Sequence, residues 1–185
     1  MRMTERDVEE YRALRATIRE RGTARVWAFV VGLVAWAGLV IATAALAALP
    51  VATLLPLLVL AAVFEAVFAL HIGVERIGRY LQVYFEDEDT SGWEHVAMAY
   101  GRVFRGGSDP LFALAFVGAA VLNFVPVLIA EPVAIEVAVI GLAHVLFVVR
   151  IALARRQAGR QRVIELDRFQ RLRESSGASG KSGPT

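Results

Sequence analysis

The stretch from residue 26 to residue 73 reads VWAFVVGLVAWAGLVIATAALAALPVATLLPLLVLAAVFEAVFALHIG, and Glu65 is its only charged residue. Pro50 divides it into two apolar runs. A helix of about 20 apolar residues crosses a hydrocarbon core about 30 Å thick. Apolar runs of about this length occur four times in the chain, at residues 26–49, 51–73, 111–130 and 132–153. The sequence therefore predicts four transmembrane helices.

The composition agrees with this prediction, because 57% of the 185 residues are hydrophobic, whereas soluble domains have roughly 45–50%. The residues outside the four runs are too few and too scattered for a separate soluble domain. We expect one domain over residues 1–175 and a flexible Gly- and Ser-rich tail over residues 176–185. The absence of cysteine excludes disulfides and thiol chemistry.

The placement of basic residues predicts the orientation. Seven precede the first run, four lie between the second and third, and nine follow from residue 150 onwards. The other two connections, around Pro50 and around Glu131-Pro132, have none. Basic residues near span ends favour the cytosolic side, so both termini and the central segment are expected in the cytosol. Nearly all the basic residues are arginine, which with the abundant alanine suggests a bacterial inner membrane protein.

Charged segments outside the runs carry apolar residues at helical spacing. They predict cytosolic helices at residues 4–22, 74–85, 92–105 and 155–174. Thr4 with Asp7, and Ser91 with Glu94, fit the capping-box pattern at a helix start. Asp109-Pro110 is a start signal for the third run. The predicted fold is all-α: a polytopic, four-transmembrane-helix antiparallel bundle with cytosolic amphipathic helices and helical extensions.

Polar residues inside the runs form the first candidate site. Ionisable groups in a membrane are costly and usually face the bundle interior. With a rise of 1.5 Å per residue, Glu65 and His144 lie about 22 Å and about 18 Å from the outer turns. The expected intramembrane polar cluster comprises Glu65, Asn123, Glu136 and His144.

Two interpretations of this cluster are open. In the first, which we favour, Glu65 is protonated or paired and only ties two helices together, since an interhelical hydrogen bond contributes about 0.6–2 kcal/mol without any further role. In the second, a Glu65–His144 pair, with Asn123 and Glu136 above it, forms a polar path for protons or a small cation.

The predicted helix at 92–105 supplies the second candidate site. Trp93, Val96, Tyr100 and Phe104 share one of its faces. Aromatic residues are enriched at protein interfaces, so this face is expected to dock on a second copy or on a partner. The alternative is that the helix packs back on the bundle or lies on the membrane surface.

Motifs of the common enzyme classes are absent from the sequence. It contains no P-loop, dinucleotide fingerprint, nucleophile elbow or zinc-ligand spacing. We therefore expect no catalytic residues, no cofactor and no metal. Acids interrupt the arginines, so a nucleic-acid partner is not expected. The expected partners are membrane lipids, with a homo-oligomer or larger membrane complex formed through the cytosolic helices.

These observations favour a non-enzymatic integral membrane protein that serves as an accessory, scaffold or assembly subunit of a membrane complex. The alternative is a small proton- or cation-linked transporter or channel that uses the intramembrane Glu65 and His144. A membrane enzyme ranks third, because too few polar groups converge to define a reaction.

Overall fold

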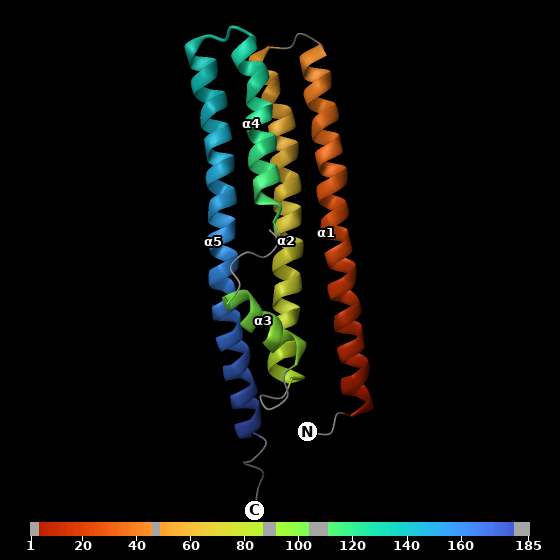
Figure 1. The fold of residues 1–185 in the computed structure, drawn as a ribbon. Helices are drawn as coiled ribbons and strands as arrows, with labels where there is room; N and C mark the ends of the chain where they lie inside the picture. Colours follow the sequence, from red (N-terminus) through yellow and green to blue (C-terminus); the bar gives the residue numbers. More distant parts are fainter. Residues whose placement is uncertain (1–3, 46–48, 87–91, 104–110, 180–185) are drawn as a thin grey trace, which may run out of the picture. The chain divides into compact units, whose positions relative to one another are not determined.

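The computed structural model describes residues 4–45, 49–86, 92–103 and 111–179, and all regular structure within them is helical (Figure 1). The elements are α1 (Glu5–Ala45), η1 (Pro50–Thr53), α2 (Leu54–Tyr84), α3 (Trp93–Val103), α4 (Ala113–Ile129) and α5 (Ala134–Ser179). For this part of the chain the predicted all-α class is confirmed. Three helices, α1, α2 with η1, and α5, are long and apolar enough to cross a membrane, and α4 is a shorter apolar helix.

Each of the long helices joins an apolar segment to a charged one without a break, as the sequence suggested for α2 and α5 but not for α1. Helix α1 begins with the predicted capping box, in which the Thr4 amide donates to the Asp7 carboxylate at 2.8 Å and the Asp7 amide donates to the Thr4 hydroxyl at 3.2 Å. It then continues through Gly22 without a break. Helix α5 likewise joins the fourth run to the predicted 155–174 helix. It ends at Ser179, within the segment expected to be a tail, and residues 180–185 lie outside the described part.

The chain reverses between α4 and α5 through a left-handed residue. The amide of Ala130 donates to the carbonyl of Pro126, and Glu131 has a φ of 48°. A left-handed residue after the last helical turn is a common way to end a helix. At the other end of α4, Phe112 also has a positive φ of 49°. The predicted start signal at Asp109-Pro110 and the predicted cap Ser91 both lie outside the described residues.

Contacts between Cα atoms divide the chain into two compact units. The apolar unit comprises residues 23–71 and 109–156, and the charged unit comprises residues 1–22, 72–108 and 157–185. Helices α1, α2 and α5 contribute to both. The expectation of a single domain over residues 1–175 stays a prediction.

The apolar unit consists of η1 and of helical segments from α1, α2, α4 and α5, and most of its core and of its surface is apolar. In its core Phe64 and Phe116 are fully buried and meet edge to face with ring centroids 5.2 Å apart. Large apolar side chains such as Leu58, Leu114 and Val145 cover its surface. Helices that are apolar all round are typical of a membrane environment. The end of α1, the start of α2, the end of α4 and the start of α5 lie at the same end of this unit (top of Figure 1).

Ion pairs connect the helices of the charged unit. Glu75 accepts hydrogen bonds from Arg79 at 2.8 Å and from Arg162 of α5 at 2.9 Å. Arg76 of α2 donates to Glu165 of α5 at 2.8 Å. These pairs join α2 to α5 within the charged unit.

Candidate functional site

Asn123 is the centre of the polar interior of the apolar unit. Its Nδ2 donates to the carbonyl of Thr53 at 2.9 Å and to Nε2 of His144 at 3.0 Å. Its Oδ1 accepts a hydrogen bond from the indole Nε1 of Trp36 at 3.2 Å. One buried amide therefore connects α1, η1, α4 and α5 and uses both of its N–H groups and its oxygen.

His144 completes this network as a neutral ring. Its Nε2 accepts from Asn123, so the proton lies on Nδ1, which donates to the carbonyl of Ile140 at 2.8 Å. A protonated imidazole has only donors and could not accept the Asn123 bond. The network thus holds His144 in one tautomer.

Glu65 has a different partner from the one expected. Its carboxylate accepts a hydrogen bond from Nη2 of Arg150 in α5 at 2.7 Å. The Glu65–His144 pair that the transport alternative needs is therefore not formed, and these two residues lie in separate contacts. The physical reason is reach: the long arginine side chain extends from the end of the fourth run to the level of Glu65.

Glu136 caps its own helix. Its Oε2 accepts a hydrogen bond from the amide of Val133 at 3.1 Å, just before the first turn of α5. The first amides of a helix lack partners within it, so a nearby carboxylate is stabilising there. Of the four predicted cluster residues, the structure brings together Asn123 and His144, and places Glu65 and Glu136 in contacts of their own.

Two carboxylates hold the polar side of α3. Glu86 accepts hydrogen bonds from the amides of Glu94 and His95, at 2.8 and 3.1 Å, and from the His95 ring at 2.7 Å. Burial alone would raise the pKa of Glu86, but these hydrogen bonds outweigh it and hold that pKa below its ordinary value of 4.5. Glu86 thus caps α3.

Glu94 connects α3 to α1. Its carboxylate pairs with the guanidinium of Arg15 at 2.8 Å. It also lies against Gly78 of α2, where an added Cβ would stand 3.0 Å from its Oε2. Burial raises the pKa of Glu94 above 4.5, although Arg15 opposes this shift.

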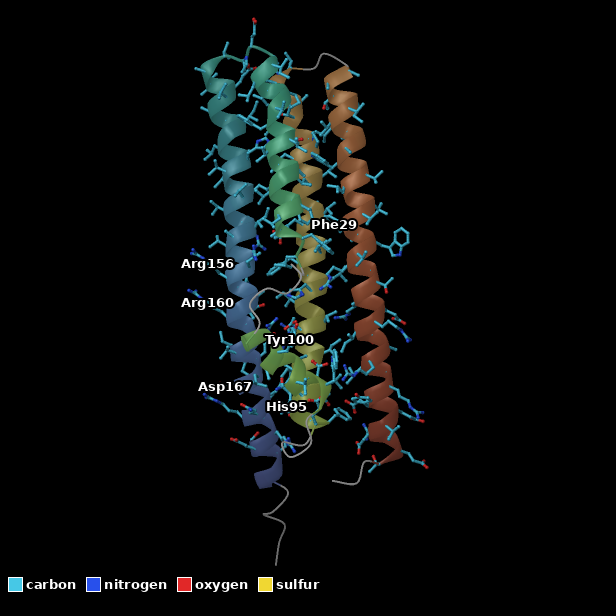
Figure 2. The ribbon with its side chains drawn as sticks, in the orientation of Figure 1. Phe29, His95, Tyr100, Arg156, Arg160 and Asp167 are labelled. Carbon is cyan, nitrogen blue, oxygen red and sulfur yellow. The ribbon has the colours of Figure 1, made fainter. Side chains whose placement is uncertain are left out.

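With its polar side held in this way, α3 exposes its apolar side. Trp93 is 69% exposed, Tyr100 61% and Val96 46%, and Figure 2 labels Tyr100 and His95 on this helix. Phe104, the fourth residue of the predicted docking face, lies outside the described residues. Helix α3 therefore points its apolar face outward, whereas an amphipathic helix that packs on a core buries that face.

Several partners of the predicted site residues were missed in the sequence analysis. They include Trp36, which donates to Asn123, and Arg150, which donates to Glu65. A further contact lies outside the predicted site: Nη1 of Arg25 donates to Nδ1 of the buried His71 at 3.1 Å. Residue spacing could have found Arg150, because it lies only about 9 Å of helix rise beyond His144 and its side chain is long. Nothing in the sequence pointed to Trp36.

Among the described residues there is no group of three or more His, Asp or Glu that could hold a metal ion. No family model, no curated protein and no solved structure matches the chain. The inference of function therefore depends on the physical features of the molecule.

Proposed function

We propose that the chain crosses the inner membrane of a bacterium four times, with α1, α2, α4 and α5 as the spans. The apolar exterior of the apolar unit supports this proposal, because such a surface is unfavourable in water. Helix α4 has 17 residues and a length of about 26 Å, close to the hydrocarbon thickness of about 30 Å.

Unpaired arginines support an orientation with both termini in the cytosol. Arg155, Arg156 and Arg160 follow the apolar part of α5 directly, are exposed, and have no hydrogen-bond or ion-pair partner within the described part of the chain. In Figure 2 the side chains of Arg156 and Arg160 project outward from α5. Arginines beside a span favour the cytosolic side, and the exposed Trp27 suits the interface at the corresponding part of α1.

Within the membrane the protein serves as a non-enzymatic accessory or scaffold subunit that binds another protein through α3. The observation that carries this proposal is the outward apolar face formed by Trp93, Val96 and Tyr100. A solvent-exposed Trp and Tyr on one helical face resemble the aromatic anchors that dominate protein interfaces. Glu86 and Glu94 hold α3 from its other side, so the face is presented in a fixed orientation before a partner binds.

The experiment is purification of the tagged full chain from native membranes after gentle extraction and cross-linking. The double variant Trp93→Ala/Tyr100→Ala is compared with Val163→Ala/Leu172→Ala, which removes exposed apolar side chains of α5 in the same unit. We expect the wild type and the α5 control to co-purify in one complex of defined size, and the α3 variant to lose it.

Two results would count against this function. One is a wild-type protein recovered as a monomer after cross-linking in native membranes. The other is a complex that both double variants retain equally, since the partner would then be bound by a different surface.

A further inference from the structure

A shallow, open groove lies between α2 and α5 on the apolar unit, with a volume of about 320 Å³. Six of its lining residues are apolar and one is charged: Leu54, Leu57, Leu58, Ala61, Ala143, Phe147 and Arg150. Two of these residues are alanines with little bulk, and Leu57 and Phe147 are buried. The volume lies at the lower end of the range of ligand pockets.

The charged end of the groove is held in place from two sides. The guanidinium of Arg150 donates to Glu65 at 2.7 Å, and its Cζ lies 5.0 Å from the ring centre of Phe68 and 6.0 Å from that of Phe64. An arginine has five N–H donors. Within the described residues only one of these donors has an acceptor, so the others are available to a ligand.

This ion pair is open to the surroundings, since the Arg150 side chain is 36% exposed and the Glu65 side chain 48%. In a membrane, exposed ionised groups are costly unless a polar partner covers them. The pair lies near the charged boundary of the bundle, because Arg155 and Arg156 follow Arg150 by only about 8–9 Å of helix rise. A headgroup at that boundary can therefore reach it.

The length of the groove is close to the thickness of one leaflet. From Leu54 to Glu65 the helix rises about 16 Å, against about 15 Å for half of a 30 Å hydrocarbon core. Because Glu65 lies about 22 Å from the outer turn, an acyl chain that enters beside Arg150 and fills the groove crosses the bilayer centre and ends at Leu54, about 6 Å from that turn.

We propose that this groove binds one acyl chain of a phospholipid from the cytosolic leaflet, with the phosphate on Arg150 and a primary ammonium of the headgroup on Glu65. The inference rests on the proposed membrane placement and is independent of the docking role of α3. Charge decides the headgroup: a phosphate near Arg150 also meets the Glu65 carboxylate, which repels an anion. An ammonium on the same headgroup offsets that repulsion, so phosphoethanolamine fits better than phosphoglycerol.

The test uses the full chain, purified in detergent and delipidated, and titrated with an equimolar mixture of phosphatidylethanolamine, phosphatidylglycerol and phosphatidylcholine of the same acyl chains. Native mass spectrometry counts the bound lipids. We expect one phosphatidylethanolamine per chain to bind in preference to the other two lipids. The loss of a charge-assisted hydrogen bond in Arg150→Gln should weaken its binding by about tenfold or more.

A second variant tests the charge argument without depending on a loss of binding. Glu65→Gln leaves the charge of Arg150 uncompensated, so the preference should shift from phosphatidylethanolamine towards phosphatidylglycerol. Ala143→Phe fills the groove and should weaken all three lipids. Arg155→Gln removes an exposed arginine outside the groove and is the matched control, which should bind as the wild type does. Circular dichroism of each variant verifies that the helices are intact.

Three results would overturn the proposal. They are equal binding of the three lipids, an unchanged lipid preference in Glu65→Gln, and a loss of lipid affinity in Arg155→Gln as large as the loss in Arg150→Gln. A lipid-free dimer that Arg150→Gln dissociates would assign the groove to a second copy instead. If one of these results is obtained while the chain still needs detergent and still forms its α3-dependent complex, only the lipid-binding proposal for the groove is wrong. If it is soluble without detergent, the membrane placement fails as well.

Discussion

The side-chain amide of Asn123 in α4 donates a 3.0 Å hydrogen bond to Nε2 of His144 in α5. The same amide also joins Trp36 and Thr53. Because every donor and acceptor of this amide is used, the polar centre of the apolar unit is a closed network that holds four elements together. A network of this kind explains buried polar residues in an apolar bundle without a transport role.

Asn123→Ala should destabilise the bundle by about 2 kcal/mol. Interhelical hydrogen bonds in membrane proteins contribute about 0.6–2 kcal/mol each, and the substitution removes three while leaving buried groups unpaired. The neighbouring Leu122 is exposed, so Leu122→Ala is the control and should change stability much less. Thermal unfolding in detergent, followed by circular dichroism, measures both. Equal melting temperatures for the two variants would show that the network is dispensable.

Two glycines of α1 should respond in opposite directions to the same substitution. A Cβ at Gly32 would clash with the methyl groups of Val63 in α2, whereas a Cβ at Gly38 meets nothing within 4 Å. Gly32→Ala should therefore destabilise the contact of α1 with α2, by about 1–3 kcal/mol. Gly38→Ala should be neutral or stabilising by up to about 1 kcal/mol, because alanine favours a helix. The melting temperatures of the two variants, each compared with the wild type, test this prediction. A higher melting temperature for Gly32→Ala would show that α1 does not pack closely on α2.

The ion pairs of the charged unit should contribute differently to stability, according to how deeply each pair is buried. The Arg79 side chain is only 6% exposed beside Glu75. Glu75→Ala removes the carboxylate that pairs with this buried guanidinium and should lower the free energy of unfolding by about 3 kcal/mol. The Arg171–Asp167 pair has the same i,i+4 spacing but is exposed, and Asp167→Ala should cost less than about 0.5 kcal/mol. Hydrogen exchange of the α2 and α5 amides, measured by mass spectrometry, compares the two. Similar protection in both variants would contradict the prediction.

The two carboxylates that hold α3 should titrate on opposite sides of pH 4.5. The folded pKa of Glu86 is lowered, so its contribution to stability is present above 4.5 and is lost as the pH falls through the folded pKa. The pKa of Glu94 is raised by burial, so as the pH falls Glu94 is protonated before Glu86. As the pH rises through the folded pKa of Glu94, the buried carboxylate becomes charged and stability decreases.

Nuclear magnetic resonance can measure these titrations directly. The amide protons of Glu94 and His95, which donate to Glu86, should shift with a midpoint below 4.5, while the carboxyl carbon of Glu94 should shift with a midpoint above it. Glu86→Gln should abolish the low-pH transition of the two amides. A common midpoint for both carboxylates would show that α3 is not held as described.

Hydrophobic runs and helical periodicity were sufficient to predict the all-α class and the three long apolar helices. The end of α2 at Tyr84, expected near Phe85, and the Thr4–Asp7 capping box follow from local rules that depend on neighbouring residues alone. The continuity of α1 through Gly22 was missed because a single glycine weakens a helix by only about 1 kcal/mol, which the flanking residues can offset.

The candidate sites were harder to predict, because they depend on contacts between distant segments. Helix rise placed Glu65 and His144 at similar depths, but depth does not specify which side of a helix faces which neighbour. It also ignores side-chain length, which lets Arg150 take the place expected for His144. The aromatic face of α3 was found because its spacing is local, whereas its outward direction is set by Glu86 and Arg15, which come from other segments.

The central claim is a chain that crosses the membrane four times with both termini on one side. Since it contains no cysteine, single cysteines can be placed at Glu5, Val51, Ala97, Val133 and Ser176, all of which are exposed. A membrane-impermeant maleimide applied to spheroplasts should label the cysteines at 51 and 133, and should label those at 5, 97 and 176 only after the membrane is opened. Labelling of 97 and 133 from the same side would show that α4 does not cross, and labelling of all five from outside would contradict the account.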